Sequence, residues 1–346
     1  MKKIIIASTR PGAGKTSLMT GLMADFKSNS AYLKPLGDRL IYKRKKNCDY
    51  DANFMVNYLG LDQDPENLSL GFDHLKLKYK YNDLSALYQA LDKNITMVSS
   101  KKEFLFIEGG SDIFYGSSLG LDPLSLAKNL KASLVLVVSG DDNQIMDDIK
   151  FIKNHIDLKG IDFAGVIVNK IQDVDDFALT LKSEILDLGI NLLGTVPYKE
   201  KLVNYTVKYL SEQFFAKVIT GEDNLDNVIE NIFVGAMSTG ESLRNPLFNK
   251  SNKLLITSGD RVDMTLAALE SDTVGILLTN NILPSSKIIS KAAEKNIPIL
   301  LVTNDTYEMA KKIDKLEALI SNDNQERIKF FTDLSRKYLE SKKVLE

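Results

Sequence analysis

Short apolar runs alternate with segments of helical periodicity along the first part of the chain. Continuous apolar runs are typical of strands buried on both faces, and an apolar residue every three or four positions is typical of a helix with one buried face. The runs lie at residues 4–7, 31–34, 103–108, 132–139, 163–168 and 192–198, with helical patterns at 17–26, 49–59 and 83–99. This order predicts an α/β fold with a parallel sheet. Residues 62–81 lack clear periodicity and are expected to form an irregular excursion over the mouth of a site.

The same alternation starts again later in the chain. Apolar strands are expected at residues 232–236, 254–257, 275–279 and 299–302, with helices between and after them, and a helical pattern at 203–219 precedes them. A chain of 346 residues has room for about two domains. We therefore divide it into a domain at 1–200, a linker helix at 201–230, a smaller α/β domain at 231–320 and a charged helical tail at 321–346.

The first apolar run passes directly into a sequence suited to binding phosphate. Between it and the next helical pattern stand Thr9, Arg10, Pro11, Gly12, Ala13, Gly14, Lys15, Thr16 and Ser17. Small residues let backbone N–H groups surround an anion, Lys15 reaches the outer phosphates, and the Thr16 hydroxyl is suited to Mg²⁺. Thr9 holds the first glycine position of the strict P-loop motif, so a chance glycine turn is the alternative. The flanking strand and helix favour a nucleoside triphosphate.

Two carboxylates are candidates for the same metal ion. Asp51 opens a helical pattern, and Glu108 ends an apolar strand directly before two glycines. Carboxylate oxygens suit Mg²⁺, and the carboxyl ends of parallel strands meet at one edge of a sheet. We therefore predict a metal site made of Thr16, Asp51 and Glu108. The alternatives are that Asp49 or Asp51 only caps a helix and that Glu108 only ends a strand.

Three further polar features are expected near the same edge. Lys34 ends a strand and either points at the bound anion or is a solvated edge residue. Asn169 follows another strand and offers a donor and an acceptor to the edge of a base, although Asn is also common in loops. Arg39 and the basic run 43–46 form either a solvated loop or a site for an anionic substrate or partner.

Composition excludes several classes of function. Hydrophobic residues make up 44% of the chain, charged residues 26%, and the formal net charge is −2, so binding to DNA or RNA is not expected. One cysteine and two histidines leave no internal disulfide and no soft ligand set for zinc or an iron–sulfur cluster. No run approaches the ~20 apolar residues of a membrane span, and the apolar start of the chain is too short for an export signal. We expect a cytoplasmic protein.

The first domain resembles dethiobiotin synthetase and, more closely, the dethiobiotin-synthetase-like domain that begins long bacterial phosphotransacetylases. The matching features are Thr9 through Thr16, Lys34-Pro35, Asp51, Glu108-Gly109, Val168-Asn169 and Leu193 through Tyr198. The resemblance implies that Lys15 and Lys34 act on the phosphates and the transferred phosphoryl group. It also implies that Thr16, Asp51 and Glu108 hold Mg²⁺. Asn169 and Pro197 are then expected at the adenine of ATP.

Departures from this family concern the substrate. Pro11 and Gly12 stand where the family enzymes have an acidic residue and a threonine, and residues 36–39 replace a turn of small residues. Biotin synthesis is therefore not expected. Arg10 stands where partition-type P-loop ATPases carry an extra lysine that acts across a dimer, although a solvent-exposed arginine is the alternative.

The second domain is similar to a DRTGG domain, a module regarded as regulatory in phosphotransacetylases. The similarity rests on residues 234–238, 259–261, 267–269 and 305–307. Backbone N–H groups of the turn around Gly259 and Asp260, with the Arg261 side chain, are suited to an anionic small molecule. The alternative is a glycine turn in which Asp260 caps a helix.

Two classes of function follow from these features. The favoured class is an MgATP-binding regulatory or scaffold protein with at most slow ATPase activity, whose second domain binds an unknown small molecule. The alternative is an ATP-dependent ligase or carboxylase in which Lys34 and the basic run hold an acidic substrate. A homodimer is expected, with the apolar helix surface around Leu266, Ala267 and Leu269 or the strand near Leu300 as its contact.

Overall fold

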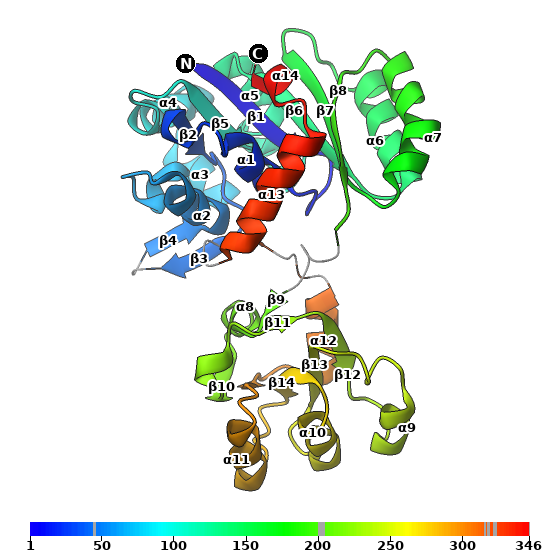
Figure 1. Cartoon of the computed structure of the whole chain (residues 1–346). Coiled ribbons are helices and arrows are strands. Elements are labelled where there is room, and N and C mark those ends of the chain that lie inside the picture. Colours follow the sequence, from blue (N-terminus) through cyan, green and yellow to red (C-terminus); the bar gives the residue numbers. More distant parts are fainter. Residues whose placement is uncertain (44–45, 200–204, 315, 317–318, 321–323, 346) are drawn as a thin grey trace. The chain divides into compact units, whose positions relative to one another are not determined.

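The computed structural model describes residues 1–43, 46–199, 205–314, 316, 319–320 and 324–345 (Figure 1). It divides into two compact units, one made of Met1–Tyr198 with Leu319–Glu346 and the other of Lys199–Ala318. Along the chain, the second unit is therefore inserted between two segments of the first. Each unit has its own sheet and its own hydrophobic core.

A six-stranded parallel sheet forms the centre of the first unit. Its order is β2-β5-β1-β6-β7-β8. The strands are β1 (Lys2–Ser8), β2 (Ser30–Leu33), β5 (Phe104–Glu108), β6 (Ser133–Ser139), β7 (Asp162–Ile171) and β8 (Leu192–Pro197). All six apolar runs thus form strands, as predicted. The strands that follow β1 first fill one side of it, β2 at the edge and then β5 beside β1, and β6 then starts the other side. The loop after β1 therefore opens where the strand order reverses, which is where ligands bind in such sheets.

Helices and one hairpin complete the first unit. The α-helices are α1 (Lys15–Met23), α2 (Tyr50–Leu59), α3 (His74–Lys80), α4 (Leu84–Val98), α5 (Pro123–Leu130), α6 (Asp142–His155), α7 (Val174–Asp187), α13 (Gln325–Tyr338) and α14 (Ser341–Leu345). Short 3₁₀ turns are η1 (Lys27–Asn29), η2 (Pro65–Leu68) and η3 (Ser117–Leu119), and the hairpin pairs β3 (Leu40–Lys43) with β4 (Lys46–Asp49). The periodicity of helix α4 predicts a buried stripe of Leu84, Leu87, Leu91, Ile95 and Val98, and the helix buries all of these except Leu84, which is exposed in its first turn.

Two local expectations in this unit are corrected by the structure. The segment 62–81 is not irregular throughout, because η2 and α3 lie within it. Helix α3 has only seven residues and buries only Leu77, so its sequence is too short to display a helical period. The basic run lies on the β3–β4 hairpin rather than in an open loop, and its Arg44 and Lys45 lie outside the described residues.

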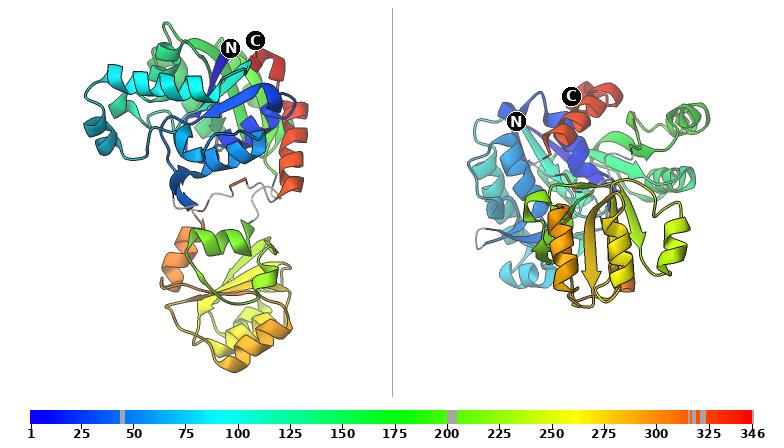
Figure 2. Two further views of the ribbon diagram at one scale, coloured as in Figure 1. Left: turned by 90° about the vertical axis from the view of Figure 1, so that its left-hand side faces the viewer. Right: turned by 60° about the horizontal axis from the view of Figure 1, so that its bottom comes forward.

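The tail of the chain returns to the helix that follows the phosphate-binding loop. Figures 1 and 2 show α13, in red, alongside α1, in dark blue. A Cβ atom at Gly21 of α1 would lie 1.8 Å from Ser335 Oγ of α13, so only glycine permits this approach. The Glu340 N–H donates to the Leu193 carbonyl, which attaches the tail to β8 as well. The residues expected as a charged tail are thus part of the first unit.

The second unit contains a five-stranded sheet with the order β10-β15-β14-β13-β12. Four strands are parallel, and β10 pairs with β15 in the antiparallel direction. The strands are β10 (Lys217–Thr220), β12 (Asn231–Val234), β13 (Lys253–Ser258), β14 (Thr273–Thr279) and β15 (Ile299–Leu301), with a small ladder of β9 (Tyr205–Thr206) and β11 (Val228–Ile229). The helices are α8 (Val207–Gln213), α9 (Thr239–Arg244), α10 (Val262–Leu269), α11 (Ser286–Glu294) and α12 (Thr306–Asp314), with a 3₁₀ turn η5 (Glu222–Asn224). Separate core clusters contain α10 with α11 and α8 with α12, so helices cover both faces.

The structure also bears on the linker helix and the dimer surfaces that were expected for this unit. The linker helix expected at 201–230 is reduced, among the described residues, to α8. Its apolar residues belong to the core of the second unit, and Phe215 adopts a left-handed φ of 49° that ends the helical path before β10. Of the expected dimer contacts, Leu266 is exposed and Leu269 is buried on the helix surface, and Leu300 lies on a strand paired on both sides. No helix in the described ranges is both long and apolar enough to cross a membrane.

Candidate nucleotide and metal site

The loop between β1 and α1 has the conformation that its glycines allow. Gly12 and Gly14 have φ angles of 69° and 95°, which residues with side chains rarely adopt. A Cβ atom at Gly14 would also lie 2.5 Å from Asn169 Nδ2. The loop is therefore held in one path, in which it leads from the end of β1 into the N-terminus of α1, the position that favours anions.

Side chains from two neighbouring elements, β7 and α6, hold this loop. Asn169 Nδ2 donates to the Ala13 carbonyl at 2.7 Å, and Lys170 Nζ donates to the Gly12 carbonyl at 2.7 Å. Arg10 makes a two-pronged ion pair with Asp148 of α6 at 2.8–2.9 Å. The sequence places Asn169 near a base, whereas the structure places its amide against the loop backbone. Sequence reasoning missed Lys170, whose only signal is its position next to Asn169.

Lys15 is buried and holds its charge against neutral partners. Its Nζ donates to Ser8 Oγ at 2.9 Å and to the Ser111 carbonyl at 3.3 Å. Burial lowers the pKa of Lys15, although the Glu108 carboxyl acts in the opposite direction. A phosphate oxygen at this position would give the ammonium an anionic partner that Ser8 and Ser111 do not provide.

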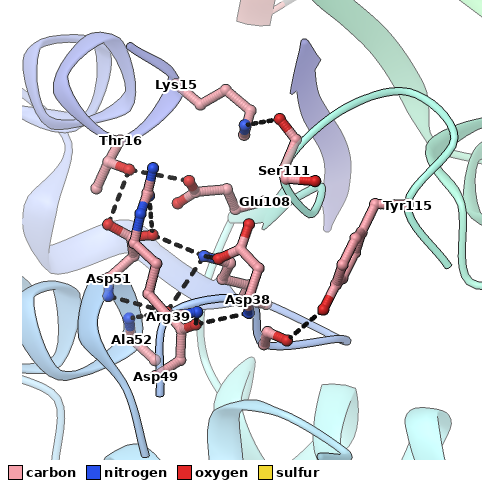
Figure 3. Close-up of polar contacts among 12 residues, drawn as sticks. Lys15, Thr16, Asp38, Arg39, Asp49, Asp51, Ala52, Glu108, Ser111 and Tyr115 are labelled. Atoms are coloured by element: carbon pink, nitrogen blue, oxygen red, sulfur yellow. Dashed lines mark hydrogen bonds and ion pairs between the residues drawn. The ribbon is translucent and has the colours of Figure 1, made fainter. Parts of the chain in front are cut away.

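The three predicted metal ligands lie together, although they come from α1, α2 and β5. Thr16 Oγ1 is 3.1 Å from Asp51 Oδ1 and 2.9 Å from Glu108 Oε1, and all three side chains are buried (Figure 3). Since a hydroxyl has one hydrogen, Thr16 can donate to only one of the two carboxyl groups at a time. A proton on Glu108 would complete the second bond. Burial and the nearby Asp51 charge raise the pKa of Glu108 to about 7.

This donor set fits Mg²⁺. A hydroxyl and two carboxylates are hard oxygen ligands of the kind that magnesium prefers beside phosphate groups. Tyr32 donates to Glu108 Oε2 at 2.8 Å, which orients that carboxyl group toward Thr16. Sequence reasoning missed Tyr32, because an aromatic residue in an apolar strand is an ordinary core residue.

Lys34 lies at the centre of a buried cluster of carboxylates. Its Nζ is 2.5 Å from Asp38, 2.6 Å from Asp51 and 3.2 Å from Asp49. Burial alone would lower the pKa of Lys34, but the surrounding carboxylates outweigh it and raise the pKa well above its usual value. The ammonium thus stands where three carboxylates converge, and it is enclosed rather than exposed at an edge.

Asp49 and Asp51 have separate roles in this arrangement. The Asp49 side chain caps α2 by accepting from the N–H groups of Asp51 and Ala52, as the capping alternative predicts for it. It also accepts from the N–H groups of Asp38 and Arg39, at 3.1 Å each. The Asp51 side chain instead points to Thr16, Lys34 and Arg39. Asp38 is a contact that the sequence did not reveal, because its cluster exists only after folding.

A cavity of about 390 Å³ lies beside the loop, at the carboxyl ends of β6, β7 and β8. Its walls combine the loop backbone with polar and aromatic side chains. The lining residues are Arg10, Pro11, Gly12, Ser139, Gly140, Asp141, Gln144, Lys170, Gln172 and Tyr198. Pro197, which was expected at the adenine, directly precedes Tyr198 but does not line the cavity. The cavity and the acid cluster therefore flank the loop on different sides of β1, since β6, β7 and β8 lie on one side and β5 and β2 on the other.

The turn expected to hold a ligand in the second unit is braced by its own contacts. Arg261 donates to the carbonyls of Gly235 and Met237 at 3.3 and 2.9 Å and pairs with Asp263 at 3.3 Å. A Cβ atom at Gly259 would lie 1.7 Å from the Ile282 carbonyl oxygen. The N-cap of α10 is Arg261, without a side-chain cap, so capping by Asp260 is not observed.

Comparison with known protein families also separates two domains along the chain. The model of an AAA domain matches residues 2–206, and the model of a DRTGG domain matches residues 210–316. The chain belongs to this AAA domain family. Its first part is a dethiobiotin-synthetase-like P-loop domain, a DRTGG domain follows it, and together they are homologous to the N-terminal region of phosphate acetyltransferases. The resemblance inferred from the motifs is thus confirmed.

Curated relatives match nearly the whole chain at low identity. The phosphate acetyltransferase of Pseudomonas putida is 25% identical over 366 residues, which cover 99% of this chain and 51% of the relative. That of Synechocystis is 24% identical over 311 residues, covering 81% of this chain and 44% of the relative. The chain therefore spans about half the length of these relatives.

Solved structures offer only distant likeness. The MinD cell division protein of Aquifex aeolicus is 17% identical with a TM-score of 0.36, covering 58% of this chain and 84% of that one. The CBS and DRTGG domains of the regulatory region of Clostridium perfringens pyrophosphatase, solved with diadenosine tetraphosphate, are 20% identical with a TM-score of 0.27. They cover 32% of this chain and 45% of that one, and neither score supports an argument about function.

Proposed function

We propose that this protein binds MgATP in its first domain and serves as a regulatory or scaffold protein, with at most slow ATPase activity. The observation that carries the proposal is the convergence of Lys15, Thr16, Asp51 and Glu108 on one edge of the sheet beside a loop held open by glycines. Backbone N–H groups and Lys15 would bind the phosphates. Mg²⁺, held by Thr16, Asp51 and Glu108, would neutralise phosphate charge.

The cavity beside the loop is the proposed place of the nucleoside. It begins at Gly12, where the phosphates would end, and extends toward Gln172 and Tyr198. The Tyr198 ring provides an aromatic surface on which a base can stack, and the Gln172 amide offers both a donor and an acceptor. Adenine presents one of each along the same edge, so ATP is the favoured nucleotide.

The side chains around Lys34 favour a regulatory function over ligase chemistry. A ligase acting on an acidic substrate would need this ammonium to face the substrate, but Asp38, Asp49 and Asp51 already satisfy it. A second carboxylate would have to displace one of these acids against their combined negative charge. The pairing of a P-loop domain with a DRTGG domain, which is shared with phosphate acetyltransferases, also supports a regulatory role and a small-molecule ligand for the second domain.

Calorimetry with ATP and Mg²⁺ tests the proposal. Lys15→Ala is expected to weaken ATP binding by roughly 30-fold or more, since a hydrogen bond to a charged group is worth about 2 kcal/mol. Lys150→Ala is the matched control, because Lys150 pairs with Glu184 at the surface and its loss should leave ATP affinity unchanged. Equal affinity in wild type and Lys15→Ala would remove the nucleotide site, and ADP release stimulated by a small acid would favour the ligase.

We also propose that the protein forms a homodimer, since two-fold dimers are the commonest closed oligomers. Arg10 supports it only indirectly, because its ion pair with Asp148 lies within one chain. Light scattering at micromolar concentration, with and without MgATP, separates a dimer from a monomer. A monomer under both conditions would end this part of the proposal without affecting nucleotide binding.

A further inference from the structure

One carboxylate of the candidate metal site is shared by two cations. Asp51 Oδ1 is the oxygen near Thr16, whereas Asp51 Oδ2 accepts from Lys34 Nζ at 2.6 Å and from Arg39 Nη1 at 2.8 Å. Figure 3 shows the Arg39 side chain reaching into this cluster alongside the backbone that carries Asp38. A metal ion held through Asp51 would therefore meet two positive side chains on the same carboxylate.

The two cations differ in how readily they can leave. Lys34 is fully buried, and its removal would leave Arg39, on Asp51, to offset the charge of three converging carboxylates. Arg39 reaches Asp51 from the rim, and its side chain is 23% exposed. Its guanidinium can regain water when it turns away, so its separation from Asp51 costs less than that of Lys34.

The backbone of Arg39 stays in place independently of its side chain. Its N–H donates to Asp49 Oδ2 at 3.1 Å, and its carbonyl accepts from the Tyr50 N–H at 2.9 Å. These bonds fix the base of the β3–β4 hairpin. The side chain can therefore leave Asp51 without loss of the hairpin, which makes the guanidinium the movable member of the cluster.

We propose that Arg39 is the resident counter-ion of the metal site and competes with Mg²⁺ for Asp51. A divalent cation and a guanidinium on one carboxylate repel each other, so the binding of one weakens the binding of the other. Arg39 offsets part of the negative charge of Asp38, Asp49 and Asp51 when no metal is bound. It thereby lowers the affinity of the site for free metal. This assignment rests on the metal site of the proposed function, and a bound phosphate group would offer the displaced guanidinium a new anionic partner.

Titration with Mn²⁺ alone, followed by electron paramagnetic resonance, tests the competition without nucleotide or activity. Arg39→Ala is expected to bind Mn²⁺ about tenfold more tightly than wild type, a change near the lower limit for one hydrogen bond to a charged group. Arg39→Lys, which keeps the charge, is expected to stay within about threefold of wild type. Lys46→Ala is the control on the same hairpin, because Lys46 pairs with Asp64 and Glu66 instead. Its Mn²⁺ affinity should not change.

The sign of the change separates competition from a merely structural role. If Arg39 only supported the fold of the site, its loss would loosen the ligands and weaken Mn²⁺ binding. Unchanged or weaker binding by Arg39→Ala therefore overturns the proposal. Arg39→Gln, which retains a hydrogen-bond donor without charge, replaces Arg39→Ala if the latter does not fold, and the same tightening is expected.

A measurement on wild type needs no variant. Labelling of arginines with phenylglyoxal, read by mass spectrometry, is expected to increase at Arg39 when Mg²⁺ is added and to stay constant at Arg336, whose partner Asp25 lies at the surface. Constant labelling of Arg39 at saturating metal overturns the proposal. If Lys15→Ala fails to weaken ATP binding but Arg39→Ala still tightens Mn²⁺ binding, the proposed function fails while the competition stands. The converse pattern removes only the competition.

Discussion

The two sheets of this protein end in very different carboxyl edges. At the first edge, Lys15, Lys34, Asp51 and Glu108 are buried, and each lies close to another charged or ionisable group. At the second edge, Arg261 is partly exposed and braces two backbone carbonyls. Buried charges stabilise a fold less than apolar residues of the same size would. The first edge is therefore the one shaped for a charged ligand, whereas the second is largely satisfied by its own backbone.

The largest effect on stability is expected when the buried Lys34 of the first unit is replaced. Lys34→Met leaves three carboxylates around a neutral side chain and should lower the free energy of unfolding of the first unit by about 3–5 kcal/mol. Lys253→Met is the comparison in the second unit, where the lysine is also buried but donates to the Asp272 carbonyl at 3.1 Å. Its replacement should cost less than ~1.5 kcal/mol. Lys253 begins β13, so it lies at the opposite end of its strand from the carboxyl edge. Urea unfolding of both variants checks both costs, and equal losses would show that burial of the lysine, rather than its carboxylate partners, sets the cost.

Glu108 makes the stability of the first unit depend on pH between 4.5 and 7, whereas the lowered pKa of Asp263 at the second edge, about 2, acts only in acid. Its pKa of about 7 in the folded protein lies above its ordinary value of 4.5, so the folded state binds the proton more tightly than the unfolded state. The metal-free protein should therefore lose up to about 3 kcal/mol of stability as the pH rises from 4.5 through 7. Glu108→Gln should remove this slope and be more stable than wild type at pH 8 in EDTA.

Unfolding experiments with added Mg²⁺ test whether Glu108 takes part in metal binding. Wild type should regain stability at pH 8 because a bound cation favours the ionised carboxylate, whereas Glu108→Gln should respond much less. Unfolding by urea at pH 5.5 and pH 8, with EDTA or Mg²⁺, measures all four cases. A variant whose stability tracks that of wild type at both pH values would show that Glu108 is ionised throughout.

A smaller effect is expected at the second edge. Arg261→Ala removes the donor to Gly235 and Met237 and should cost about 1–2 kcal/mol in the second unit. ATP affinity should not change. If the second domain binds a small molecule at this turn, the variant should also lose the coupling between that molecule and ATP, which linkage requires to be equal in both directions. Calorimetry and a thermal-shift screen of metabolites, each with and without MgATP, provide the readouts.

The smallest effect is expected from the ion pair that ties Arg10 to α6. Asp148→Asn should change stability by less than ~1 kcal/mol, because the Arg10 side chain is partly exposed and water screens the pair. It should nevertheless free the guanidinium. An increase in MgATP-dependent dimer on light scattering would assign Arg10 to a contact between chains, and an unchanged distribution would leave it as a support of the loop.

Local sequence was sufficient for the elements and for the loop. Each apolar run became a strand because burial on both faces needs only a continuous stretch of apolar residues. Gly12 and Gly14 are recognisable because the positive φ angles of the loop exclude other residues. Thr16, Asp51 and Glu108 could be proposed as a set because Thr16 follows the phosphate-binding loop, Glu108 ends a strand at the same edge of the sheet, and Asp51 begins a helix nearby. Helix α3 and the extent of α8 were not predictable, since short helices carry little periodicity.

Only the tertiary structure decided the partners of the charged side chains. Arg10 lies 138 positions from Asp148, and Asn169 lies 156 positions from the Ala13 carbonyl that it holds. No spacing in the sequence encodes such pairs. The enclosure of Lys34 and the reach of Arg39 to Asp51 likewise depend on how β2, the hairpin and α2 pack together. The sequence alone thus indicated where an anion and a metal are expected, and packing decided which charged side chains converge there, because electrostatic energy depends on distances in space and on burial.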